Sequence, residues 1–152
     1  MDKEKHKALS EQESFSIIYR HGKIMHDKAM KKFGLTGHQM GYLKHICQRP
    51  GISQEELAQL HRIDKGAVAK AIKGLVGKGY VRREKNPDDK RAYRLFPTAK
   101  AIKLSEKAQC HGEDIEKKMT AGMTEEEIRT LKILLAKLTD NIAKMLEEGE
   151  NL

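Results

Sequence analysis

Residues that build β-rich or disulfide-bonded domains are scarce in this 152-residue chain. It contains no Trp, three Phe, four Tyr and three Pro, whereas Lys, Glu, Ala and Leu are abundant. Such a composition favours helices over a β-sandwich or a barrel. The two cysteines, Cys47 and Cys110, are too few for a disulfide framework or, alone, for a four-ligand zinc site.

Long apolar runs are also missing. No stretch approaches 18 uncharged apolar residues, so we expect no transmembrane span. The first 14 residues are charged and have no apolar centre, which is not the pattern of a secretory signal. The length is typical of one domain, and the cytoplasm is the expected location.

Positive charge is concentrated in a short part of the chain. Residues 61–100 contain twelve Lys/Arg and four Asp/Glu, a net charge of +8 that equals the charge of the whole chain. Residues 1–60 carry +3 and residues 101–152 carry −3. A local basic block points to a polyanion, most often nucleic acid, with a merely solvated surface as the alternative.

Hydrophobic periodicity and capping signals divide the chain into helices. Ser or Thr followed three residues later by Gln or Glu marks helix starts at Thr36, Ser53 and Thr124, and Asp64 is a good N-cap. These signals predict helices over 9–33, from 36 to the Pro50-Gly51 pair, 54–61, 65–78, 98–119 and from 124 to near 149. The apolar sides expected for the two short helices consist of Leu57, Leu60, Val68, Ile72, Leu75 and Val76.

The two helices over 54–61 and 65–78 have the spacing of a helix-turn-helix. Two strand candidates follow, over 80–84 and 91–96, and a turn cluster over 86–89 joins them. This order predicts a β-hairpin wing. The predicted fold is therefore mostly α with a small β-hairpin wing.

The last predicted helix carries an apolar heptad repeat. Its members alternate at steps of three and four: Ile128, Leu131, Leu135, Leu138, Ile142 and Met145. Such a seam packs either against the chain's own helices or against a second copy.

The wing sequence carries a family resemblance. The multiple-antibiotic-resistance regulator (MarR) family shows the pattern D-x-R-x-x-x-L-x-L-T in its wing. This chain resembles it at Asp89, Arg91, Leu95 and Thr98, and departs from it at Pro97. The order of elements is similar over roughly residues 15–146. The resemblance implies a winged helix-turn-helix with dimerisation helices at both ends of the chain.

The resemblance also implies which residues meet duplex DNA. The helix over 65–78 would enter the major groove, and Arg91 would enter the minor groove with its guanidinium held by Asp89. The hydroxyl side chains common in this helix of the family are replaced here by Gly66, Ala67 and Ala69. Recognition is therefore expected to depend less on hydrogen bonds to bases and more on DNA shape and phosphate contacts. The expected DNA contacts are Ser53, Arg62, Lys65, Gly66, Ala67, Ala69, Lys70, Lys73, Lys85, Asp89, Lys90, Arg91 and Arg94.

The implied assembly is a homodimer on an inverted repeat with half-sites about 10 bp apart. Residues 1–34 and 100–152 would form its dimerisation region, and residues 35–99 the DNA-binding region. Phe15 and Ile18 would join the heptad residues at the dimer interface. The family resemblance further implies a repressor relieved by a small aromatic ligand. His21, Met25, His38 and Tyr42 are candidates for that effector pocket.

Two other functions are open from the residues. The small side chains of the recognition helix are compatible with an architectural protein that coats DNA without sequence preference. The seven histidines and Cys110 suggest a second alternative, a redox or metal sensor of the same fold. No metal-ligand spacing is present, however, and no cofactor is expected. Neither a nucleophile elbow nor a phosphate-binding glycine loop occurs, so we expect no enzyme.

Overall fold

The computed structural model describes residues 9–89 and 91–149. Its helical and strand elements confirm the predicted class, a mostly α chain with a small β wing. In chain order they are α1 (Glu11–Met30), the 3-10 turn η2 (Lys31–Phe33), α2 (Gly37–Gln48), β1 (Ile52–Ser53), α3 (Gln54–His61), α4 (Lys65–Gly77), β2 (Val81–Lys85), β3 (Tyr93–Pro97), α5 (Ala99–Met119) and α6 (Glu125–Glu147).

Local capping signals set the helix boundaries. Thr36, Ser53 and Thr124 form the capping boxes that the sequence predicts, each with the side chain three residues further on. Asp64 and Thr98 cap α4 and α5 by accepting a hydrogen bond from the backbone N–H three residues later. Helices α2 to α6 therefore begin within one residue of their predicted starts, whereas α1 begins at Glu11, two residues after the predicted start.

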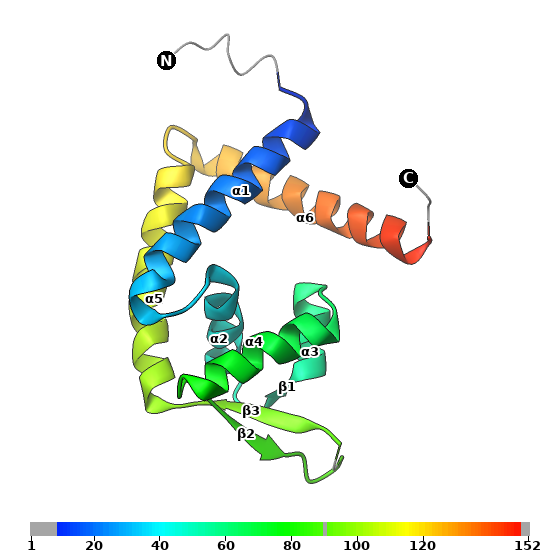
Figure 1. Cartoon of the computed structure of the whole chain (residues 1–152). Helices are drawn as coiled ribbons and strands as arrows, with labels where there is room; N and C mark the ends of the chain where they lie inside the picture. The colour runs from blue at the N-terminus through cyan, green and yellow to red at the C-terminus, as the bar shows by residue number, and fades with distance from the viewer. Residues whose placement is uncertain (1–8, 90, 150–152) are drawn as a thin grey trace.

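The elements form a lobe and a set of longer helices. α2, α3, α4 and the sheet make the lobe, and α6 lies on the side of α2 and α3 that faces away from the sheet (Figure 1). The three strands are antiparallel in the order β1-β3-β2, with Leu95 opposite both Ile52 and Arg83. Strand β1 was not predicted, because two residues are too short for a periodic signal.

The hydrophobic core lies in the lobe. Its fully buried side chains come from α2, α3, α4 and β3, namely Leu43, Ile46, Leu57, Val68, Ile72, Leu75 and Leu95. α5 adds Ala101 and Leu104, whereas no residue of α6 is buried. In the described part of the chain, no helix has both the length and the apolar character needed to cross a membrane.

Two of the predicted core positions were wrong. Leu60 is 47% exposed and Val76 is 37% exposed. The covered side of α3 is centred between Leu57 and Ala58, which turns Leu60 to the edge of the contact. Val76 is likewise rotated to the edge of the α4 stripe, because the helical period places it away from the centre of that stripe.

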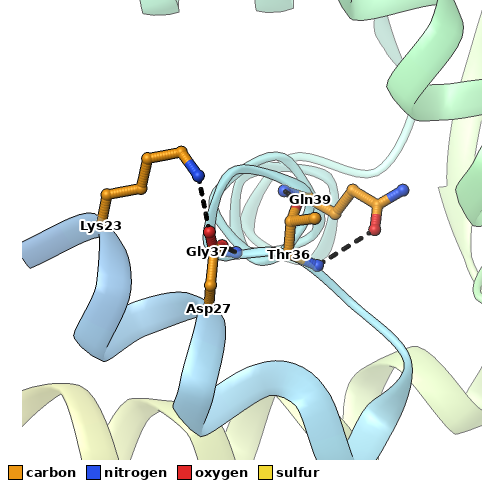
Figure 2. Close-up of polar contacts among 5 residues, drawn as sticks. All are labelled: Lys23, Asp27, Thr36, Gly37 and Gln39. Atoms are coloured by element: carbon orange, nitrogen blue, oxygen red, sulfur yellow. Dashed lines mark hydrogen bonds and ion pairs between the residues drawn. The ribbon is translucent and has the colours of Figure 1, made fainter. Parts of the chain in front are cut away.

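A polar junction joins α1 to the start of α2 (Figure 2). Asp27 accepts hydrogen bonds from the Lys23 ammonium at 2.7 Å and from the backbone N–H of Gly37 at 2.8 Å. Both contacts hold the pKa of Asp27 below its usual value. A Cβ on Gly37 would lie 2.7 Å from the Cβ of His26, so only glycine fits where the two helices meet.

Candidate nucleic-acid interface

The turn between α3 and α4 is tight and fixed by its backbone. Asp64 Oδ1 accepts from the N–H of Ala67 at 2.9 Å and starts α4. α3 ends at His61, and its C-cap residue Arg62 is left-handed at φ 51° and donates its N–H to the carbonyls of Ala58 and Gln59. The left-handed residue reverses the chain within two positions, so α4 begins directly after the turn. This is the geometry of a helix-turn-helix.

Helix α4 separates its side chains onto two faces. Val68, Ile72 and Leu75 are fully buried in the core. The opposite face carries the predicted DNA contacts, with Lys65, Gly66, Ala67, Lys70 and Lys73 exposed and Ala69 half-buried. The exposed face of this helix therefore presents lysine ammonium groups among the very small side chains of glycine and alanine.

Asp89 organises the loop of the wing. Its Oδ1 accepts from the backbone N–H of Arg91 at 2.9 Å, and its carbonyl accepts from the N–H of Ala92 at 3.0 Å. Asp89 thus holds the backbone of the loop and not the guanidinium of Arg91, which the resemblance implies as its partner. The side chain of Arg91 is exposed.

A groove of about 690 Å³ runs between the helix-turn-helix and the wing. Six of the thirteen predicted contacts line it: Ser53, Lys65, Ala69, Asp89, Arg91 and Arg94. The groove is formed because β1 pairs with β3, which places the start of α3 beside the wing. Its lining brings Lys65, Arg91 and Arg94, which are far apart in the sequence, onto one surface together with Glu55, Glu56 and Asp89.

Carboxylates that the sequence did not indicate lie in the groove, as Glu55 does, or pair with a groove cation from outside its lining, as Asp88 does. Glu55 accepts from the Lys65 ammonium at 2.6 Å, and Asp88 lies 3.4 Å from the Arg94 guanidinium. Glu55 stands in the first turn of α3 and Lys65 in the first turn of α4, a placement that only the folded turn reveals. These carboxylates pair two of the groove's cations in the protein alone.

The remaining predicted contacts lie in several places. Lys70, Lys73 and Lys85 are exposed, as is Arg91 of the groove, and none of these four has a carboxylate within 4 Å among the described residues. Lys90 lies outside the described residues. The Arg62 guanidinium does not line the groove; it contacts α6 instead.

Of the four candidates for an effector pocket, three are exposed and one is buried. Neither the groove at the wing nor the cavity of about 470 Å³ along α6 is lined by them. His21, Met25 and His38 are exposed, whereas Tyr42 is buried and packs edge-to-face on the ring of His61 at 4.7 Å.

A cluster of rings lies beside Tyr42. His45 and His61 pack edge-to-face with ring centroids 4.9 Å apart. Burial lowers the pKa of both histidines, and it raises the pKa of Tyr42. His61 Nε2 is buried without a hydrogen-bond partner in the described structure. The cluster therefore favours neutral rings.

The predicted dimer residues lack partners within the described chain. Phe15, Ile18, Leu135, Leu138 and Ile142 are between 39% and 57% exposed. Ile128, Leu131 and Met145 are partly covered. The apolar surface of α6 is wider than the heptad seam, because Ile133 and Leu134 are also about half exposed.

The described residues provide neither a metal site nor a reactive thiol for the sensor hypotheses. Among the described side chains, no three His, Cys, Asp or Glu residues gather as metal ligands. Burial raises the pKa of the half-buried Cys47 thiol, which disfavours the reactive thiolate. The side chain of Cys110 lies outside the described part.

The helix-turn-helix, the β-hairpin and the groove between them define a winged helix-turn-helix DNA-binding protein. Comparison with known proteins places it more narrowly. A sequence profile of the MarR family matches residues 33–92. The chain is 34% identical over 114 residues to the uncharacterized HTH-type transcriptional regulator YybA of Bacillus subtilis (strain 168), covering 75% of this chain and 76% of that protein.

A second relative and a solved structure agree with this placement. The multiple antibiotic resistance protein MarR of Escherichia coli (strain K12) is 31% identical over 137 residues, covering 82% of this chain and 94% of that one. A putative MarR family transcriptional regulator from Listeria monocytogenes, solved with a 26mer DNA, superposes with a TM-score of 0.86 at 28% identity, covering 95% and 98% of the two chains.

This chain belongs to the MarR family. It is a DNA-binding transcriptional regulator and not an enzyme. The family resemblance seen in the wing motif is thereby confirmed.

Proposed function

We propose that the protein is a homodimeric transcriptional repressor that binds an inverted repeat in duplex DNA and is released by a small aromatic ligand. The proposed location is the cytoplasm. The observation that carries the proposal is the groove between α4 and the wing, which gathers cations from separate elements on one surface. Lys70, Lys73 and Lys85 add exposed charge to the same lobe outside the groove.

The dimer is supported by the surface of the long helices. α6 is 23 residues long, and Leu135, Leu138 and Ile142 along it are each at least 40% exposed. So much apolar area on one helix is costly in water and is typical of an interface. In this proposal residues 1–34 and 100–152 form the dimerisation region, and residues 35–99 bind DNA. A two-fold dimer would then read half-sites about one helical turn apart.

Selection from random duplexes tests the DNA-binding part. Purified protein at near-physiological salt is expected to recover an inverted repeat that it prefers over unrelated duplex by at least about 10³-fold. The exposed small side chains of Gly66 and Ala67 favour the architectural alternative, which predicts tight, salt-sensitive binding without a recovered motif. Recovery of no motif would therefore replace the proposed function by that alternative.

Ligand relief is tested with the recovered operator as the probe. Phenolic and aromatic carboxylic acids are expected to release the labelled operator when they bind between the lobe and the dimer helices. Substitution of His38 or Met25 by Ala is expected to raise the ligand concentration needed for release while the affinity for DNA is retained. If no compound in such a panel changes DNA binding, relief by an aromatic ligand is not the mechanism.

A further inference from the structure

We propose that Arg62 is a positioning residue, which holds the DNA-binding lobe against α6 and thereby sets where the recognition helix stands in the dimer. The proposal rests on the dimeric DNA-binding function proposed above. It gives Arg62 a different task from the DNA contact that the sequence predicted.

The backbone of Arg62 indicates that its side chain is needed. Arg62 is the one residue other than glycine with positive φ among residues 9–89 and 91–149. The five other positive-φ positions there are all glycines. A left-handed conformation disfavours residues that carry a Cβ. Glycine would relieve the strain at this position, so the presence of arginine indicates that its guanidinium makes an interaction that the protein needs.

The guanidinium contacts two residues of α6. One terminal nitrogen donates to the backbone carbonyl of Thr139 at 3.0 Å, and the other lies 2.6 Å from Asp140 Oδ1. Two contacts from one planar guanidinium fix an orientation as well as a distance. In the described part of the chain, no other hydrogen bond or ion pair joins α6 to residues 35–99.

The position of this contact connects two surfaces. Arg62 lies two residues before Asp64, the N-cap of α4, so its anchor point is next to the start of the recognition helix. Asp140 lies two residues from both Leu138 and Ile142, and the helical period turns it to the side of α6 opposite the heptad seam. Helix α6 therefore carries the proposed dimer seam on one side and the Arg62 contact on the other.

The expected consequence is control of half-site spacing. Two lobes that are each held against α6 would keep their recognition helices at a fixed separation. A lobe that is released at this point would reach a wider range of separations and would lose affinity for the matched operator. The exposed ion pair itself stabilises folding little, so its effect belongs to lobe placement.

The test uses Arg62→Gly and Asp140→Asn in the full chain. Lys132→Gln is the matched control, because Lys132 pairs with Glu116 of α5 at the same distance of 2.6 Å without touching the lobe. Both test variants are expected to stay dimeric and to bind the selected operator about five- to tenfold more weakly. They should also lose part of the wild-type penalty for one base pair inserted between the half-sites.

Three further readouts separate positioning from other roles. Arg62→Gly should not lower the Tm, because glycine relieves the left-handed strain. The exchanged pair Arg62→Asp with Asp140→Arg should recover part of the lost affinity. Without DNA, amide hydrogen exchange at residues 59–64 should rise in Asp140→Asn and stay unchanged in Lys132→Gln.

Each contrary result has a definite meaning. If Arg62→Gly weakens binding, reduces the salt slope by about one phosphate contact and Asp140→Asn does neither, Arg62 touches DNA directly and the positioning role is refuted. Unchanged exchange and unchanged spacing preference in both variants refute it as well. If the wild type selects no operator, the proposed function fails, and the exchange experiment alone decides whether Arg62 holds the lobe.

Discussion

At the scale of single residues, Gly37 shows how one missing side chain permits the approach of two helices. We expect Gly37→Ala to destabilise the fold by about 1–3 kcal/mol, because the new methyl would overlap His26 at the start of α2. Urea unfolding measures the change. The control is Gly112→Ala in α5, where a Cβ meets nothing within 4 Å. That variant should gain about 0.5–1 kcal/mol, and equal stabilities of the two variants would contradict the steric account.

Arg91 is the residue on which the wing assignment depends. Its backbone is held by Asp89 while its side chain stays exposed beside the groove. We expect Arg91→Ala to weaken operator binding by about 1–3 kcal/mol and to leave the dimer intact. Fluorescence anisotropy and sedimentation measure the two properties. Lys107→Ala, an exposed cation of α5, is the control, and an unchanged Kd for Arg91→Ala would remove the wing from the interface.

Residue roles were harder to predict than residue positions. Lys65 and Arg91 were both expected near DNA from the resemblance, and both line the groove. Glu55 and the partner of Arg62 were missed, because each depends on a contact across the fold: Glu55 pairs over the turn with Lys65, and Arg62 reaches Asp140 at a sequence separation of 78. No local pattern encodes such pairs.

At the scale of elements, boundaries were predictable and burial was less so. The helix starts at Thr36, Ser53 and Thr124 were predictable because the two residues of each capping box lie only three positions apart in the sequence. Which side of a short helix is covered depends on its neighbours. For that reason Leu60 was wrongly assigned to the core, and β1 was found only from its pairing with β3.

The contact between α2 and α3 predicts a pH dependence of stability. Burial lowers the pKa of His45 and His61 below the ordinary value of 6.5. The unfolded chain therefore binds more protons, so the free energy of unfolding is highest above pH 6.5 and falls as the pH drops toward the folded pKa values. Nearby Lys44 and Arg49, together with His38, oppose a further positive charge.

We expect the Tm to fall between pH 7.5 and pH 5.5, before most carboxylates titrate. His61→Phe keeps a ring against Tyr42 and removes both the titration and the unpartnered Nε2, so its Tm should depend less on pH. Differential scanning calorimetry at several pH values measures this. His21→Gln is the control, because His21 is exposed on α1. A His61→Phe profile parallel to that of the wild type would exclude the ring cluster as the source.

At the scale of the whole molecule, charge and apolar surface occupy different regions. The basic excess of +8 lies in residues 61–100, which include α4 and the wing. Residues 101–152 carry −3 and include α6 with its exposed apolar side chains. A polyanion is therefore attracted to the lobe and not to α6. The apolar helix is left for a partner that excludes water, which a second copy of the chain would supply.

That division predicts how the dimer can be broken without unfolding the lobe. Leu135→Lys combined with Leu138→Lys places two ammonium groups in the proposed seam, where burial of unpaired charge opposes association. Because both side chains are at least 40% exposed in the single chain, the lobe core should keep its stability. Sedimentation should then show a monomer, with operator affinity falling as the second half-site contact is lost. Ala136→Lys, exposed on α6 outside the heptad positions, should stay dimeric. A dimeric mass for the double variant would move the interface away from α6.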